Sequence, residues 1–124
     1  MSSLSPMQSN QISQSDNREE SLRKCLTAYR TSTACIQHCL KLGGEHADPD
    51  HILILMNTSE ICRTFSQFLL SESHYSHELC GITSRICLAC ADSCDSFDRQ
   101  ENEMMLECSS ACLAFAQTCK DLEQ

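Results

Sequence analysis

Apolar and small residues recur three and four positions apart through four segments of the chain. This spacing places them on one face of an α-helix, and no stretch shows the alternation of a half-buried strand. Turn and capping residues separate the segments: Gly43-Gly44 ends the first, and Asp48-Pro49 opens the second as an N-cap followed by a first-turn proline. The predicted helices cover about residues 18–42, 49–71, 75–97 and 99–121.

Capping signals also precede the first and the last of these helices. Residues 16–19 and 98–101 each begin with Asp and carry Glu three positions later, which is the arrangement of an N-cap with an acidic third position. Residues 1–17 are rich in Ser, Gln and Asn and predict a disordered N-terminal tail. Because the connections are short, residues 18–124 are predicted to form an all-α, antiparallel up-down four-helix bundle.

Eleven of the 124 residues are cysteines, and they follow the helical spacing that an ordinary bundle fills with leucine. A thiol is much smaller than a leucine side chain, so a core built on this pattern alone would be underpacked, and cavities are costly. A soft metal ion held by thiolates would fill the missing volume. All eleven are therefore predicted to face the interior as metal ligands: Cys25, Cys35, Cys39, Cys62, Cys80, Cys87, Cys90, Cys94, Cys108, Cys112 and Cys119.

The spacing of the cysteines and the charge of the core favour Cu(I) over zinc. Residues four apart on a helix have Cβ atoms about 5–6 Å apart, so two such sulfurs can grip one ion. A Cu(I) ion that replaces a thiol proton leaves the core neutral, whereas zinc with four thiolates carries a net negative charge that a low-dielectric core resists. Three pairs have this spacing: Cys35 and Cys39, Cys90 and Cys94, and Cys108 and Cys112.

The overall charge narrows the classes of partner. Nine Lys and Arg against seventeen Asp and Glu give a net charge of −8, which argues against nucleic acid and against anionic membranes. No run approaches the roughly 18 apolar residues of a membrane span, and residues 1–17 lack the basic and apolar regions of a secretory signal. We therefore expect a cytoplasmic protein with free cysteines. No catalytic constellation is apparent, so we expect no enzyme activity.

The segment from Cys80 to Cys94, with cysteines at 80, 87, 90 and 94, and the Cys108-Ser-Ser-Ala-Cys112 motif resemble the family of cysteine-lined four-helix-bundle copper storage proteins. The resemblance covers roughly residues 20–122. It implies a bundle that stores several Cu(I) ions per chain in the cytosol, held by CxxxC pairs and bridged between helices. It also implies a homo-oligomer, often a tetramer, with copper chaperones or small thiol carriers as candidate partners.

Members of this family gather His or Met at the end of the bundle where copper enters. In an up-down bundle that pole is formed by the ends of the first and third helices and the starts of the second and fourth. Met105 lies on the cysteine face, one turn before Cys108, and is the strongest candidate. The predicted copper-uptake residues are Met105, Met104, His38, His46, His51 and Met56.

Two other function classes stay open at this point. A redox-responsive interaction protein would use an exposed, low-pKa cysteine, and the pattern supplies none outside the predicted core. A structural zinc or iron–sulfur helical protein would use the same sulfurs, although the zinc-knuckle and ferredoxin spacings are missing. Storage or buffering of Cu(I) is the function that the sequence favours.

Overall fold

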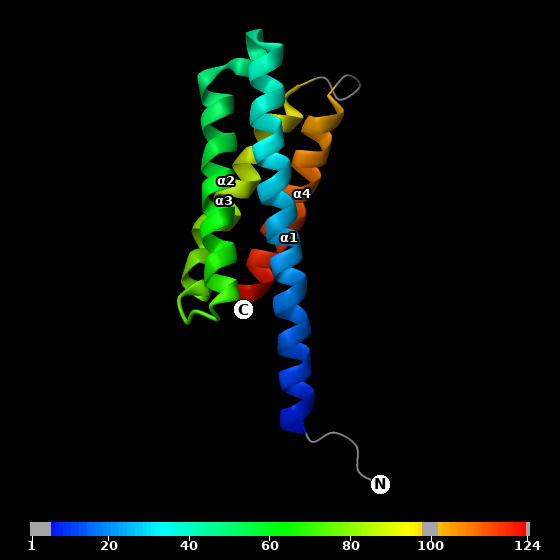
Figure 1. The fold of residues 1–124 in the computed structure, drawn as a ribbon, viewed down its shortest axis with the longest axis vertical. Helices are drawn as coiled ribbons and strands as arrows, with labels where there is room; N and C mark the ends of the chain where they lie inside the picture. The colour runs from blue at the N-terminus through cyan, green and yellow to red at the C-terminus, as the bar shows by residue number, and fades with distance from the viewer. Residues whose placement is uncertain (1–5, 98–101, 124) are drawn as a thin grey trace.

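The structure, a computed structural model, describes the backbone of residues 6–97 and 102–123 and the side chains from Asn17 within these ranges. Its elements, in chain order, are α1 (Pro6–Leu42), the short 3-10 helix η1 (Gly44–Ala47), α2 (Pro49–Leu70), α3 (Ser76–Asp95) and α4 (Glu103–Glu123). The four long helices run side by side, and each packs against its neighbours in the chain, with α4 returning to α1 (Figure 1). This confirms the predicted all-α up-down bundle.

The connections use the residues that the pattern singled out. Gly43 and Gly44 have φ angles of 70° and 56°, a left-handed conformation in which a Cβ is strained, so α1 ends at Leu42. Asp48 caps α2, because its carboxylate accepts a hydrogen bond from the Asp50 N–H at 3.1 Å. The capping signal at 98–101 lies outside the described residues, and α4 begins at Glu103 rather than near 99.

The first helix is longer than the sequence predicts. It begins at Pro6, and its first turns extend beyond the ends of the other helices (Figure 1), so residues 6–17 are helical where a disordered tail was expected. The polar composition suggested disorder, but proline at the first turn starts a helix at no cost in hydrogen bonds. Each further residue adds one backbone hydrogen bond to a helix that the bundle already nucleates.

Sulfur occupies the centre of the bundle. Every cysteine is free and buried, with an exposed fraction of 2% or less, which confirms that all eleven face the interior. Phe65 and Phe115 pack edge to face, with ring centroids 5.4 Å apart, and supply the only buried aromatic pair among the described side chains. On α2 the buried face runs through Thr58 and Phe65.

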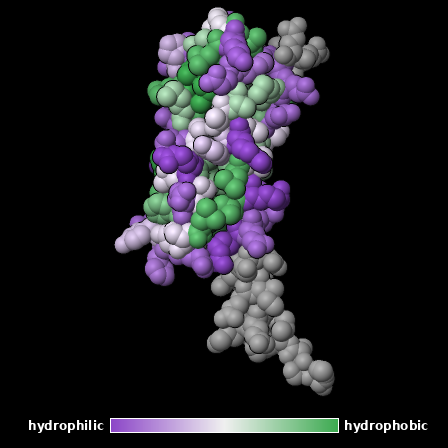
Figure 2. Space-filling model, viewed as in Figure 1, coloured by the Kyte–Doolittle hydropathy of each residue, from purple (hydrophilic) through white to green (hydrophobic). Residues whose placement is uncertain are grey.

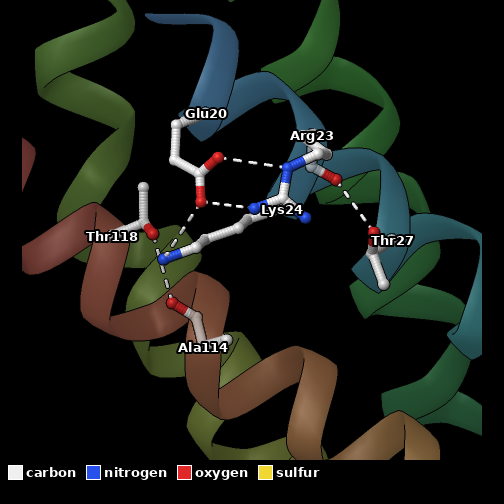
Figure 3. Close-up of polar contacts among 6 residues, drawn as sticks. All are labelled: Glu20, Arg23, Lys24, Thr27, Ala114 and Thr118. Atoms are coloured by element: carbon white, nitrogen blue, oxygen red, sulfur yellow. Dashed lines mark hydrogen bonds and ion pairs between the residues drawn. The ribbon is translucent and has the colours of Figure 1, made fainter. Parts of the chain in front are cut away.

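Charged side chains are confined to the surface of the described bundle. On α1, Glu20 binds Arg23 and Lys24 one turn along the helix, beside α4, where Thr118 donates to the Ala114 carbonyl at 3.2 Å (Figure 3). Such exposed ion pairs contribute little to stability. The face in Figure 2 mixes hydrophilic side chains with apolar patches. None of the described helices combines the length and apolar character needed to cross a membrane.

Candidate metal centre

The ends of α1 and α3 and the starts of α2 and α4 meet at one end of the bundle, which we call the His51 pole (Figure 1). The opposite end, where Cys80 lies near the start of α3 and Cys119 near the end of α4, is the Cys80 pole. Three helices contribute several sulfurs between these poles, and α2 contributes only Cys62. The site is therefore a column of thiols along the bundle axis.

At the His51 pole the column contains three kinds of soft or borderline donor. The Sγ atoms of Cys35 and Cys39 lie 3.9 Å apart, and the Met105 thioether is 3.2 Å from the first and 3.6 Å from the second. His51 places its Nε2 atom 3.4 Å from the Cys39 sulfur. The donor atoms of Cys35, His51 and Cys94 all lie within 4.8 Å of one another. Thiolate, thioether and imidazole thus converge from all four helices.

A group of sulfurs lies directly below. The Sγ atoms of Cys90, Cys94 and Cys108 lie within 4.8 Å of one another, and the Cys108 thiol also interacts with Cys35. Metal–sulfur bonds of about 2.3 Å allow one ion to join two sulfurs as much as about 4.6 Å apart. The triad is therefore already near the dimensions that a two- or three-coordinate ion requires, with little movement of the helices.

Contacts between thiols continue toward the Cys80 pole. Cys112 interacts with Cys87, and Cys87 with Cys62. The Cys25 thiol donates to the backbone carbonyl of Cys62 at 3.1 Å. At the far end Cys80 and Cys119 influence one another electrostatically, and the Cys80 thiol donates to the Ser76 carbonyl at 3.5 Å. The sulfurs thus follow one another along the bundle from one pole towards the other.

Burial keeps several of these thiols protonated at neutral pH. Burial, with the neighbouring Cys35 thiol, raises the pKa of Cys39 to about 12. Burial and the charge of Glu123 raise the pKa of Cys80 to about 11, and burial together with the Cys80 thiol raises that of Cys119 to about 12. No Lys, Arg, Asp or Glu is buried among the described side chains. A metal ion must therefore displace thiol protons, and the core holds no charged side chain to balance an excess charge.

The sulfurs of the triad and the neighbouring Cys35 thiol shift one another's pKa values. Hydrogen bonds from Cys108, followed by those from other thiols, lower the pKa of Cys35 and of Cys90. The same contacts with Cys108, Cys35 and Cys90 raise the pKa of Cys94. Cys35, Cys90, Cys94 and Cys108 thus form one group of neighbouring, interacting sulfurs.

The structure brings together some of the predicted uptake residues. Met105 and His51 are buried and contact the cysteines directly. His46 stacks on Phe97, with ring centroids 4.5 Å apart, and hydrogen-bonds to Asn102 at 2.7 Å. Phe97 also contacts the His51 ring at 4.8 Å, so His46 and Phe97 form a layer over His51. A surface hollow of about 310 Å³ lies beside this layer.

The other predicted residues are less buried than Met105 and His51. Met56 has an exposed fraction of 52% and points away from the core. Met104 and His38 are partly buried, and the Nε2 atom of His38 is buried with no hydrogen-bond partner among the described residues. Sequence reasoning missed Ser93, whose hydroxyl lies 2.7 Å from the His51 Nδ1 atom and orients the ring. Its position next to Cys94 in the chain was the one available signal.

The fold and the site define a class of protein: four-helix bundles whose interior is a column of thiols for soft metal ions. The chain belongs to the copper storage protein family, whose model matches residues 14–124. This confirms the resemblance seen in the cysteine spacing, and copper storage, rather than catalysis, is the role of this family.

Three solved structures show the same architecture. The protein Nmul_A1745 of Nitrosospira multiformis is 36% identical, with 88% of this chain and 96% of that chain covered and a TM-score of 0.80. The Cu(I)-bound copper storage protein BsCsp3 of Bacillus subtilis is 21% identical, covers 87% and 99% of the two chains, and has a TM-score of 0.80. A copper-loaded cytosolic copper storage protein of Streptomyces lividans is 21% identical, covers 87% and 92%, and has a TM-score of 0.73.

Proposed function

We propose that this chain stores and buffers several Cu(I) ions in the cytosol by binding them to the thiolates inside its bundle. The observation that carries the proposal is the column itself: eleven buried thiols reach from pole to pole, with no buried charged residue among the described side chains. Soft thiolates select Cu(I). The copper-loaded relatives of the same fold support this choice of metal.

The charge balance explains how a hydrophobic core can accept many ions. Each Cu(I) that binds one net thiolate releases one proton, so the interior keeps its charge as the column fills. Divalent ions held by four thiolates each would leave a net negative charge at every site, and the low-dielectric interior resists this charge. The three CxxxC pairs are the proposed primary sites, and Cys25, Cys62, Cys80, Cys87 and Cys119 are the further ligands along the column.

Copper enters, in this proposal, at the His51 pole. Met105 and His51 offer neutral donors that contact Cys35 and Cys39, so an ion can change ligands one at a time without being stripped of all of them. His46 lies in the layer above them and would be the first donor on the path. Met104 and His38 are nearby candidates, whereas the exposed Met56 would act only as an outer contact.

The proposed storage role also bears on catalysis, partners, oligomeric state and location. A core filled with ions has no cleft for a substrate, so we infer no catalytic turnover. Copper chaperones or small thiol carriers would deliver and remove the ions. We also infer a homo-oligomer, a tetramer by resemblance, and residues 18–124 as the storage domain. The cytosolic location of the Streptomyces lividans relative supports a cytosolic role for this chain.

An anaerobic titration with Cu(I) against a chromophoric chelator tests the proposal. We expect several equivalents to bind per chain before the chelator takes copper. Saturation at one equivalent or fewer would remove the storage function. Counting reactive thiols in the freshly purified protein separates storage from a redox-responsive role, which predicts disulfides, and elemental analysis exposes a resident zinc or iron–sulfur centre.

A further inference from the structure

The donors at the His51 pole differ from those in the rest of the column. Among the described residues below this pole, the candidate metal-binding group consists of three sulfurs, those of Cys90, Cys94 and Cys108. At the pole, an imidazole nitrogen joins three thiols, because Cys39 contacts both Cys35 and His51 while Cys35, His51 and Cys94 lie within 4.8 Å of one another. Three cysteines and one histidine are a common ligand set of protein-bound zinc.

The distances between these donors approach those of a tetrahedron. With zinc–sulfur bonds of about 2.3 Å and zinc–nitrogen bonds of about 2.0–2.1 Å, the edges of a tetrahedral site are about 3.8 Å between sulfurs and about 3.5 Å between sulfur and nitrogen. The Cys35 and Cys39 sulfurs are 3.9 Å apart, and the Cys39 sulfur is 3.4 Å from the His51 Nε2 atom. Cys94 lies within 4.8 Å of the donor atoms of Cys35 and His51, and it must move closer to them and to Cys39 to complete the tetrahedron.

A second contact prepares the histidine as a ligand. The Nδ1 atom of His51 lies 2.7 Å from the Ser93 hydroxyl, so the ring can donate a hydrogen bond there and keep the Nε2 lone pair toward the sulfurs. Metal-binding histidines are oriented and tuned in this way by a partner on their other nitrogen. Ser93 precedes Cys94 on α3, so one turn of that helix provides both a ligand and the group that positions another.

We propose that Cys35, Cys39, Cys94 and His51 form one tetrahedral site for a divalent ion of the zinc class, which shares its thiols with the proposed Cu(I) sites of the column. This inference goes beyond the proposed copper function. Three thiolates and a neutral imidazole leave a net charge of −1 around a divalent ion, less than four thiolates would. His51 also lines the surface hollow, so water near the pole screens this charge more than it would in the middle of the bundle.

Occupancy of this site has a consequence for copper. Cys94 belongs both to the divalent site and to the sulfur triad below it, so one bound zinc ion withdraws a ligand from the adjoining Cu(I) site. Met105, by contrast, contacts Cys35 and Cys39 through a thioether, a donor that suits Cu(I) and not zinc. The two metals therefore depend on different neighbours of the same thiols.

Titration of the reduced, metal-free full chain with Zn²⁺ or Co²⁺ alone tests the site. We expect one tight equivalent per chain, with the intense visible bands of a tetrahedral, thiolate-bound cobalt ion. His51→Ala should abolish those bands. Ser93→Ala should weaken zinc binding by about 10–100-fold, the usual effect of removing a partner of a ligand. Met105→Leu should leave the zinc affinity unchanged while it lowers Cu(I) uptake.

His77→Ala is the matched control, because His77 is an exposed histidine of α3 near the Cys80 pole. It should leave the cobalt spectrum unchanged, and the more conservative His51→Gln repeats the test if His51→Ala unfolds. The proposal is overturned if no tight equivalent binds, if cobalt is not tetrahedral, or if His51→Gln and His51→Ala bind as the unchanged chain does. None of these results alters the Cu(I) stoichiometry, so failure of the zinc site and failure of copper storage are separate outcomes.

Discussion

Substitution of Cys108 distinguishes the contribution of its sulfur to packing from its role as a metal ligand. Its sulfur is fully buried, belongs to the triad with Cys90 and Cys94, and forms a CxxxC pair with Cys112. In the metal-free protein, Cys108→Ala removes a group about as large as a methylene, which loses about 0.8 kcal/mol of burial. A cavity of about 25 Å³ adds about 0.6 kcal/mol, so the free energy of unfolding should fall by about 1.4 kcal/mol.

Cys108→Val is the matched variant, because it fills the space without supplying a ligand. Its metal-free stability should lie within about 1.5 kcal/mol of the unchanged protein. Both variants should lose at least one Cu(I) equivalent in the chelator titration, together with the corresponding part of the stabilisation by bound copper. Urea unfolding of the metal-free chains measures the packing term. If either variant kept the full copper capacity, the sulfur of Cys108 would be a packing group and not a ligand.

Two further predictions concern the metal-free chain. Its stability should fall as the pH rises from about 9 toward 11–12, because thiols of the unfolded chain then lose protons that buried Cys80, Cys119 and Cys39 retain up to their pKa values of about 11 and 12. The midpoint of urea unfolding against pH checks this, and constant stability over that range would contradict it. Asp48→Ala should cost about 1 kcal/mol through loss of the α2 cap, with unchanged copper capacity, whereas Asp50→Ala should change stability less.

The sequence predicts the bundle and the burial of its cysteines well because both depend on spacing within single helices. Sulfurs three and four positions apart must share a face, whatever the neighbouring helices do. The boundaries at Gly43 and Asp48 were predictable for the same local reason, since a left-handed turn and an N-cap are properties of a few adjacent residues. The start of α1 at Pro6 was not, because helix propagation from a packed bundle outweighs a polar composition.

Contacts between helices could not be derived in this way. That His51 reaches Cys39, and that Met105 reaches Cys35, depends on the relative height and rotation of three helices, which no spacing within one helix fixes. The pole residues were predicted as a group from the family resemblance and the bundle topology, so the exposed Met56 was included with the buried His51. Two residues five positions apart on one helix thus differ in burial because helical rotation places them on different faces.

The sulfurs are distributed unevenly along the column, so its two ends differ. Near the His51 pole, thiols of α1, α3 and α4 lie in contact, and the Cys35, Cys39, Cys90, Cys94 and Cys108 sulfurs connect without interruption. Toward the Cys80 pole, the Phe65 and Phe115 pair occupies part of the interior, and the sulfurs of Cys80 and Cys119 influence each other only through their charge. Hydrocarbon replaces ligands there, so that end stabilises the metal-free fold. In the proposed function, an ion bound near the His51 pole can therefore pass directly from one thiol to the next.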